Sequence, residues 1–250
     1  MRKIPFSIIK RLNKWFRPEF SLVSRQGLRW VLDKNNWIDN RLLSFRGYED
    51  INLKLMKRIV NLNSFDYVFD IGANIGFFTC HLAKQKNVKN VHAFEPMVRN
   101  YNQLCANILV NNLSSVAEAH PLALSDTNGE TTIHFNDEST GIATLNPDET
   151  VRSADDYTRS ETIQTVRFDD VFPILAQTCF IKMDVEQHEV ATLSGMKDFF
   201  KNNKACIILE INRENEDLKM LLQELGLNKL DIQTDSDDYL FANFDVKLPS

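Results

Sequence analysis

The residues best suited to chemistry form a glycine turn directly after a short apolar segment. Asp70, Gly72, Asn74 and Gly76 all belong to this turn. Glycine lets a backbone approach a ligand closely, and a helix that begins after such a turn directs its free amide groups at that ligand. A dinucleotide-binding turn has the spacing G-x-G-x-x-G, whereas the spacing here is G-x-x-x-G. The turn therefore predicts a nucleotide-like ligand other than a dinucleotide.

S-adenosylmethionine matches the charges of this turn. The sulfonium and ammonium groups of that cofactor are cationic, and its carboxylate is anionic. Asp70 can offset the cationic end, while the amide groups of the turn meet the carboxylate. Glu95 ends the next apolar segment, where an acid can accept hydrogen bonds from both ribose hydroxyls. Taken alone, Glu95 is best explained as an ordinary acid at the end of a strand. Its spacing along the chain from the glycine turn favours a role in binding the ribose.

A second cluster of polar residues follows a later apolar segment. Asp184, Glu186 and His188 alternate along the chain, so an extended backbone would point their side chains the same way. Glu210 ends the next apolar segment and can point into the same crevice. His188 or Asp184 can act as a general base for a substrate hydroxyl. Alternatively, Asp184, Glu186 and Glu210 can hold Mg²⁺ or Mn²⁺, or the acids can simply complement a helix dipole. We favour base catalysis over metal binding, and we therefore assign no residue as a metal ligand.

Alternating apolar strands and amphipathic helices must position these residues. This alternation predicts an α/β fold with one mostly parallel, seven-stranded sheet and helices on both faces. Ligands on such sheets bind at the carboxyl ends of the strands. The strands are predicted at 67–71, 90–95, 116–124, 179–184, 205–210, 230–233 and 239–244, and the helices at 41–60, 77–86, 98–112, 214–225 and from the second polar cluster to 200.

An extension over 1–46 is predicted to precede a catalytic domain over 47–250. Within it, 1–17 is basic and has apolar residues near helical spacing, and 20–31 is predicted to be a hairpin. For 1–17 we favour a helix that packs its apolar stripe on its own domain or on a second subunit. Peripheral contact with an anionic membrane surface is the alternative.

A polar segment at 136–161 interrupts the alternation of strands and helices. The segments 131–135 and 162–168 on either side can pair as a hairpin that carries it. Such a long irregular segment inside a compact domain is typical of a lid or a binding loop. We therefore expect 136–161 to shape the site of the acceptor.

Composition limits the partners and the location. The net charge of −5 argues against a nucleic-acid partner, which favours a small-molecule or glycan acceptor. No apolar run reaches the length of a membrane span. The four cysteines lie far apart among apolar neighbours, which indicates a reducing, cytoplasmic setting. If 1–17 contacts a membrane, the location would be cytoplasmic and peripheral to that membrane. The oligomeric state is not predicted. No second ligand stands at metal-binding spacing from the remaining histidines, which are expected to be structural: His81, His92, His120 and His134.

Four motifs occur in an order that resembles the FkbM family of methyltransferases. They are FDIGANIGF at 69–77, FEP at 94–96, ALSD at 123–126 and IKMDVEQHE at 181–189, and Ile207–Glu210 fits the strand-end glutamate of the family. The resemblance covers roughly 47–244. It implies a class I methyltransferase fold, S-adenosylmethionine as cofactor and, typically, O-methylation of a sugar, glycan or natural product.

The resemblance also implies roles for individual residues. Ser125 and Asp126 would contact the adenine, Glu95 the ribose, and Tyr48 would close over the cofactor. The family usually has glycine at the position of Gln187, so the loop that holds His188 is expected to differ in shape here. The cofactor-binding set is Tyr48, Asp70, Gly72, Ala73, Asn74, Gly76, Glu95, Pro96, Ser125 and Asp126, and the catalytic candidates are Asp184, Glu186, His188 and Glu210.

Two other functions are weighed against methyl transfer. A nicotinamide-dependent oxidoreductase would share the strand–turn–helix arrangement, but the third glycine is missing. No histidine–lysine or serine–tyrosine set for a hydride site is evident either. A non-catalytic module attached to a membrane by its first helix is the other alternative. The intact turn argues against that module, and Gln187 argues weakly for it.

Overall fold

A computed structural model describes residues 6–44, 48–136, 139–145, 157–211, 215–234 and 237–249. Its centre is a seven-stranded sheet with the order β11-β12-β10-β9-β3-β4-β5. Among these described strands, β12 alone runs opposite to the other six. The predicted mostly parallel sheet is thus confirmed. The strands are β3 (Tyr67–Ile71), β4 (Val91–Phe94), β5 (Ala117–His120), β9 (Thr178–Met183), β10 (Lys204–Glu210), β11 (Asn228–Lys229) and β12 (Asp238–Ala242).

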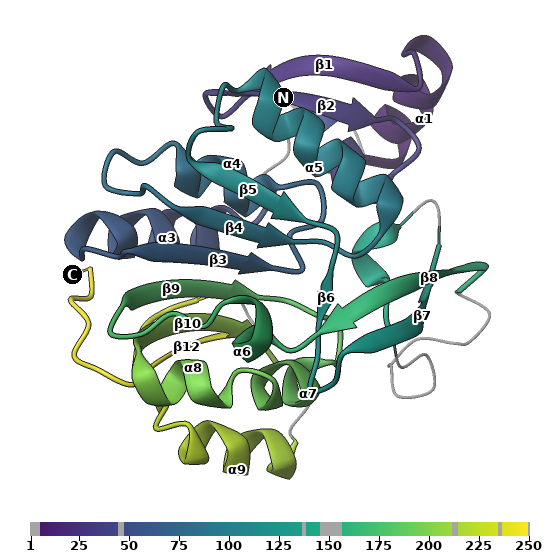
Figure 1. Ribbon diagram of the computed structural model, residues 1–250. Helices are drawn as coiled ribbons and strands as arrows, with labels where there is room; N and C mark the ends of the chain where they lie inside the picture. Colours follow the sequence, from purple (N-terminus) through teal and green to yellow (C-terminus); the bar gives the residue numbers. More distant parts are fainter. Residues whose placement is uncertain are drawn as a thin grey trace.

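Helices cover both faces of this sheet (Figure 1). One face carries α3 (Asp50–Leu62), α4 (Phe77–Ala83) and α5 (Val98–Val110); the other carries α6 (Phe168–Val171), α7 (Glu189–Ser194), α8 (Lys197–Asn202) and α9 (Glu216–Glu224). Alternate residues of the strands point to opposite faces, so Val68 and Phe69 belong to different apolar clusters. Because β4 and β9 flank β3, the strand order reverses beside β3. That reversal predicts the ligand site at the carboxyl ends of β3 and β9.

A small second sheet stands beside the carboxyl ends of the central strands (Figure 1). It has the order β6-β8-β7, with β6 (Ala123–Leu124), β7 (Gly129–Phe135) and β8 (Arg159–Val166). The antiparallel pairing of β7 with β8 confirms the predicted hairpin. The single strand predicted at 116–124 is wrong, because the chain leaves the central sheet after His120 and enters the small sheet at Ala123. Pro121 stands at this break, and proline has no N–H to donate to a ladder.

The extension consists of α1 (Phe6–Phe16), the antiparallel hairpin of β1 (Phe20–Arg25) and β2 (Leu28–Asp33), and α2 (Trp37–Leu43). Asn107 of α5 accepts a hydrogen bond from the backbone N–H of Val31 at 2.7 Å. Trp30 is fully buried and stacks on Phe77 of α4, with 5.8 Å between the ring centroids. The extension and the catalytic domain therefore share one apolar core.

Three further segments differ from the predicted elements. The helix predicted at 41–60 is divided into α2 and α3, and 45–47 between them lie outside the described residues. The helix ending at 200 is interrupted at Gly195, where a Cβ atom would meet the carbonyl oxygen of Ser125 at 2.0 Å. The strand predicted at 230–233 is also wrong, because the strand that pairs with β12 is β11, which ends at Lys229.

Parts of two predicted segments lie outside the described residues. Of the predicted lid, these are 137–138 and 146–156, and of the basic first segment they are 1–5. The described part of the lid contains a 3₁₀ turn, η1 (Thr140–Ile142). Within the described ranges, no helix is both long and apolar enough to cross a bilayer.

Candidate active site

The glycine turn after β3 has the backbone geometry that its sequence predicts. Gly72 adopts φ +78°, and a Cβ atom there would lie 1.8 Å from the carbonyl oxygen of Asp184. Gly76 adopts φ +82° at the start of α4, where a Cβ atom would lie 2.5 Å from Leu104. Both positions therefore exclude side chains through conformation and through close approach. The turn holds β3 against the segment that follows β9.

Asp70 lies behind the turn rather than in front of it. Its side chain is fully buried, and its Oδ2 accepts hydrogen bonds from the backbone N–H of Thr79 at 2.8 Å and from the hydroxyl of Thr79 at 2.5 Å. These bonds satisfy a free amide group in the first turn of α4. Burial raises the pKa of Asp70, and the ammonium group of Lys182 opposes that shift. Asp70 thus fixes the start of α4, and its direct contact with a cofactor stays a prediction.

Glu95 follows β4 and reaches back to the glycine turn. Its Oε2 accepts a hydrogen bond from the backbone N–H of Asn74 at 2.8 Å, and its Oε1 accepts one from the N–H of Met97 at 3.0 Å. Burial raises the pKa of Glu95 to about 7, although the two backbone hydrogen bonds favour the charged form. A carboxylate held in this way can accept hydrogen bonds from the hydroxyl groups of a ribose.

A cleft opens at the carboxyl ends of β3, β4 and β9, and thus includes the place that the strand order predicts. One wall consists of residues from the turn and from β4, and the small sheet and η1 form the other wall. Of the predicted cofactor residues, Gly72, Asn74, Glu95 and Pro96 line this cleft. They are joined by Ile71, Phe94, Met97, Asn100, Leu122, Ala123, Leu124, Ile133, Thr140, Gly141, Ala143, Leu145, Ile163, Asp184, Val185, Glu186 and His188.

Lys182 is the central charge of the second cluster. It lies in β9, is 5% exposed, and its Nζ donates a hydrogen bond to Oδ2 of Asp184 at 2.9 Å. Burial alone would lower the pKa of Lys182, but the carboxylates of Asp184, Asp70 and Glu210 together raise it. Sequence reasoning missed this residue, although a lone charge inside the apolar strand 179–183 was the signal.

Glu210 ends β10 and faces Asp184. Burial and the negative charge of Asp184 together raise the pKa of Glu210 to about 9, while Lys182 opposes the shift. Glu210 is therefore protonated at neutral pH and can donate its proton toward the Asp184 carboxylate. Among the residues that the structure describes, Asp184, Glu186 and Glu210 do not form a three-ligand metal cluster. An ammonium group stands beside these carboxylates instead.

The segment after Asp184 is not extended. Glu186 adopts φ +47° and Gln187 adopts φ +74°, so the extended backbone expected from the alternation is wrong, although Asp184, Glu186 and His188 all line the cleft. The left-handed φ at Gln187 explains why glycine suits this position. His188 turns toward the small sheet, where its Nε2 lies 3.0 Å from the hydroxyl of Ser125. His188 therefore lies on the cleft side of the site.

A second, larger pocket opens on the opposite side of Asp184, with a cavity of about 720 Å³. It is mostly polar and takes residues from the extension, from α3 and from the ends of β9, β10 and β12. Gly141, Asp184 and Glu186 line both the cleft and this pocket. The other lining residues are Trp37, Ile38, Arg41, Tyr48, Glu49, Asn52, Phe78, Ser139, Ile142, Lys182, Glu210, Asp237 and Asp238.

Several predicted residues lie outside the cleft. Tyr48 lines the second pocket and packs edge-on against Phe77, with 5.0 Å between the ring centroids. Ser125 is buried beneath His188, and Asp126 is exposed. Ala73 is buried in the apolar core rather than in the lining of the cleft. The roles that the resemblance gives these residues stay predictions.

Described residues of the predicted lid line both the cleft and the polar pocket. The hydroxyl of Thr140 accepts a hydrogen bond from Asn36 of the extension at 2.8 Å, and Thr144 donates one to the carbonyl oxygen of Glu186 at 2.9 Å. A Cβ atom at Gly141 would meet Ile38 at 2.6 Å. This segment therefore connects the extension to the loop that follows Asp184. The sequence offered no periodicity from which these contacts could be found.

Comparison with known proteins agrees with this geometry. A family model described as the methyltransferase FkbM domain matches residues 70–231. The chain belongs to the FkbM methyltransferase family. It is thus a methyltransferase domain with the class I fold, and its cofactor is S-adenosylmethionine.

Three curated relatives are similar to the chain. Methyltransferase sdnD of Sordaria araneosa is 24% identical over 70% of this chain and 66% of its own length. Methyltransferase 1 of Beauveria bassiana is 23% identical over 64% of this chain and 71% of its own length. The 31-O-demethyl-FK506 methyltransferase FkbM of Streptomyces tacrolimicus is 29% identical over 56% and 62%. The chain thus spans about two thirds of the length of these relatives.

Two solved structures are also similar. TYW2 of M. jannaschii in complex with AdoMet gives a TM-score of 0.46 at 16% identity, over 91% of this chain and 85% of that chain. The METTL16 methyltransferase domain gives 0.49 at 13% identity, over 97% and 93%.

The residues of the cleft fit S-adenosylmethionine. Asn74 has a buried Oδ1 atom with no hydrogen-bond partner among the described residues, and Asn74 lines the cleft. The absence of a Cβ atom at Gly72 brings the backbone of the turn close to the Asp184 loop. Glu95 would hold the ribose, and the apolar residues around Phe94 would cover the adenine. When bound, the cofactor supplies an electrophilic methyl group on a cationic sulfur.

Proposed function

We propose that the protein transfers a methyl group from S-adenosylmethionine to a hydroxyl group of a sugar, glycan or hydroxylated natural product. The observation that carries this proposal is the junction of the two pockets. Gly141, Asp184 and Glu186 line both the cofactor cleft and the larger polar pocket. An acceptor in the polar pocket would therefore meet the cofactor beside a carboxylate.

Asp184 is the residue best placed to take the proton of the acceptor. Its carboxylate lies at the junction and is 32% exposed, so it can reach a hydroxyl group while it stays fixed by Lys182. The bound cofactor would supply the methyl group: the acceptor oxygen would bond to the methyl carbon, and the electron pair of the broken carbon–sulfur bond would stay on sulfur. The acceptor proton passes to Asp184. The alignment of these groups lowers the barrier through proximity.

Lys182 and Glu210 position that carboxylate. Lys182 holds Oδ2 of Asp184 at 2.9 Å, and the protonated Glu210 faces the same residue. Both partners are hydrogen-bond donors, so they hold the Asp184 carboxylate in one orientation beside the acceptor. His188 was the other candidate for the base, but its side chain is turned toward Ser125 on the cofactor side. We therefore assign the proton transfer to Asp184.

The lining of the polar pocket supports a hydroxylated acceptor. Asn52 donates hydrogen bonds to Glu49 at 3.0 Å and to Asp238 at 2.6 Å, so these carboxylates stand in fixed positions. Carboxylates and amides pair well with several hydroxyl groups at once. Trp37 lines the same pocket, with the guanidinium group of Arg41 lying 5.2 Å from its ring centroid. A flat aromatic side chain provides an apolar surface for one face of such an acceptor.

Methyl transfer to a panel of acceptors tests this proposal. The full chain is incubated with radiolabelled S-adenosylmethionine and with monosaccharides, glycosides and polyols, and labelled products are analysed for the methylated atom. We expect methyl ethers as products. Transfer to nitrogen or carbon acceptors alone would contradict the proposal. Binding of the cofactor, measured by calorimetry, separates a wrong acceptor class from an inactive preparation.

A further inference from the structure

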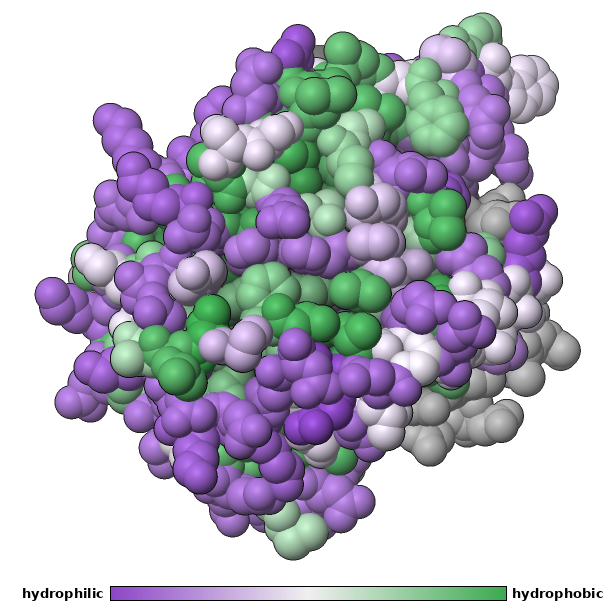
Figure 2. All heavy atoms as spheres, in the orientation of Figure 1, coloured by the Kyte–Doolittle hydropathy of each residue, from purple (hydrophilic) through white to green (hydrophobic). Residues whose placement is uncertain are grey.

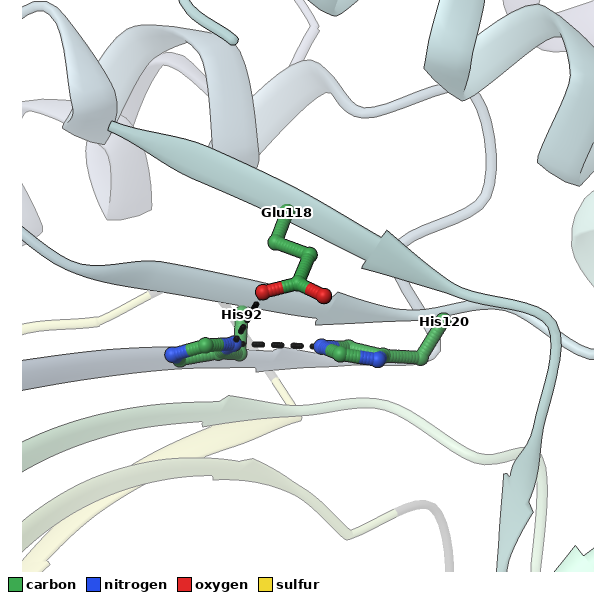
Figure 3. Close-up of side chains that lie close together, drawn as sticks. All are labelled: His92, Glu118 and His120. Carbon is green, nitrogen blue, oxygen red and sulfur yellow. Dashed lines mark hydrogen bonds and ion pairs between the residues drawn. The ribbon is translucent and has the colours of Figure 1, made fainter. Parts of the chain in front are cut away.

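Three side chains with metal-binding atoms converge at the edge of the central sheet (Figure 3), and none of them lines the cleft or the polar pocket. His92 of β4 is opposite Glu118 of β5 in the register, and His120 follows two residues later on the same face. Nδ1 of His92 lies 3.1 Å from Nε2 of His120 and 3.7 Å from Oε2 of Glu118. One ligand atom from each residue lies within 4.8 Å of the others. Sequence spacing hid this cluster, because its members come from adjacent strands.

The surroundings of the cluster are dry on one side and open on the other. The ring of Phe172 packs against His92 with 4.7 Å between centroids, and Phe94 stacks on His120 at 4.9 Å. The side chain of Glu118 is 68% exposed, and β5 is an edge strand of the sheet. An ion can therefore reach the cluster from solvent, while apolar rings hold the imidazoles in place.

We propose that His92, Glu118 and His120 form a binding site for Zn²⁺. A hydrogen bond between the imidazoles accounts for the 3.1 Å between Nδ1 of His92 and Nε2 of His120. The carboxylate of Glu118, however, lies 3.7 Å from the same Nδ1 atom, which is too long for a hydrogen bond. A cation between the three atoms explains why all of them converge. Two imidazoles and one carboxylate are ligands that zinc accepts, with water in the fourth position.

Such an ion would connect β4 to β5 close to the cofactor cleft. His120 stacks on Phe94, which lines the cleft. Glu95 follows β4 directly, and Leu122 lies just beyond β5 in the same lining. Zinc at this edge is therefore expected to stabilise the wall that would cover the adenine, and to act through positioning rather than in the methyl transfer.

Calorimetry with ZnCl₂ on the untagged full chain, after treatment with a chelator, tests the site. We expect one Zn²⁺ per chain and a higher melting temperature with the ion. Glu118→Gln keeps the shape of an exposed side chain and should weaken zinc binding at least about tenfold, the loss that even outer partners of metal ligands produce. His120→Gln should do the same. His134→Gln, which changes a histidine of β7 outside the cluster, should bind zinc like the parent, and Mg²⁺ should bind to none of these proteins at this site.

Two results would overturn the proposal. The parent chain can fail to bind Zn²⁺, which leaves a neutral histidine pair joined by a single hydrogen bond. Alternatively, Glu118→Gln and His120→Gln can bind zinc as tightly as His134→Gln, which places the ion elsewhere. The melting temperature of each variant in chelator shows whether it is folded, so a loss of binding is not confused with a loss of structure.

A second inference rests on the outer face of α1. The helix is attached by its polar side: Asn13 is buried and donates a hydrogen bond to Asn40 of α2 at 3.2 Å. Its apolar side faces outward, with Trp15 at 82% and Phe16 at 78% exposure, and Ile8 and Leu12 are also exposed. The expectation that this stripe packs on its own domain is therefore wrong, because Asn13 occupies the contact.

The exposed apolar surface continues onto β1, where Phe20 and Leu22 point outward. Figure 2 shows apolar residues at the top of the molecule, in the region of the β1–β2 hairpin. Basic residues accompany them: Lys10, Arg11, Lys14 and Arg17 lie in or next to α1, and Glu19 is the single acid between Ser7 and Arg25. The net charge of the whole chain is −5, so this face has the opposite charge balance.

We infer that this face, which consists of the outward residues of α1 and β1, rests on an anionic membrane surface. Aromatic and aliphatic side chains can enter the interface, while lysine and arginine pair with lipid phosphates. A second copy of the chain would have to place like charges opposite each other, which opposes association through this face. The inference does not depend on the acceptor of the methyl group.

Co-sedimentation of the full chain with vesicles tests this inference. We expect binding to equal parts of phosphatidylcholine and phosphatidylserine, and little binding to phosphatidylcholine alone or at high salt. Replacing both Trp15 and Phe16 with serine should abolish binding, whereas Leu175→Ser changes an exposed leucine elsewhere and should have no effect. Vesicle binding that survives the double substitution would overturn the inference. So would a dimer in solution that the double substitution converts to a monomer without vesicle binding by either form.

Discussion

The cofactor cleft and the polar pocket meet at Asp184 but are built in different ways. Backbone amides, apolar side chains and Glu95 form most of the cleft, and they come from motifs that are nearly continuous in the sequence. Acids from several distant segments line the polar pocket, from Glu49 near the start to Asp238 near the end. A cofactor with fixed chemistry can be held by one local motif, whereas an acceptor site needs side chains that the fold gathers.

Gly72→Ala is the substitution with the largest expected effect on the cleft. A Cβ atom would lie 1.8 Å from the Asp184 carbonyl oxygen and would also disfavour the φ of +78°. We expect a loss of at least about 2 kcal/mol of unfolding free energy, together with loss of S-adenosylmethionine binding. Urea unfolding and calorimetry measure the two effects.

Gly27→Ala is the matched control for that substitution. Gly27 also has φ +78°, but a Cβ atom there would meet no other atom within 4 Å. This variant should lose only about 1 kcal/mol, the cost of the left-handed backbone, and should bind the cofactor normally. Equal losses in both variants would mean that close approach at Gly72 is unimportant.

Asp184→Asn separates the two regions by function. Asparagine keeps the shape of the side chain but cannot accept the acceptor proton as a carboxylate does. We expect turnover to fall by about 10²–10⁴-fold, with cofactor affinity changed only slightly. Steady-state kinetics and calorimetry provide the two measurements. A variant that retains full turnover would remove Asp184 as the proton acceptor and return that role to His188.

The contrast between the two regions also explains what the sequence could predict. The glycine turn, Glu95 and the parallel sheet follow local patterns, and the structure places them as expected. The polar pocket could be predicted only in part, because Asn52 meets Asp238 through folding rather than through spacing.

Other failures have specific physical causes. Periodicity identified the helix of α1 but not its orientation, since a buried hydrogen bond from Asn13 decided which side faces the domain. The alternation from Asp184 to His188 failed because two residues adopt left-handed φ values. His92 and His120 were judged by their spacing along the chain, whereas the pairing of β4 with β5 brings them together.

The titration of Glu95 provides a test on the cleft side. Its pKa is raised to about 7, so the fraction of charged carboxylate falls as the pH drops through that value. A protonated Glu95 accepts the ribose hydroxyl groups less well. We therefore expect affinity for S-adenosylmethionine to fall by about threefold to tenfold between pH 8 and pH 6. Glu95→Gln should bind weakly at both pH values, and a dependence on pH that survives in this variant would assign the titration to another group.

Glu210 provides the corresponding test in the polar pocket. Its pKa is about 9 in the folded protein against an ordinary value of 4.5, so the folded state binds more protons than the unfolded chain between these values. Stability due to this group is therefore present at low pH and is lost as the pH rises through that range. Glu210→Gln should be more stable than the parent above about pH 5, by an amount that grows with pH and reaches the order of several kcal/mol at pH 8.

Urea unfolding at pH 4, 6 and 8 measures this difference, with Glu216→Gln as a control at an exposed glutamate. The gain should vanish near pH 4, where Glu210 is protonated in both states, and the control should show no trend with pH. A gain of equal size at all three pH values would mean that packing, rather than the proton shared with Asp184, governs Glu210. In that case Lys182 alone would hold the Asp184 carboxylate, and the polar pocket would resemble the cleft in having one acid fixed by donors.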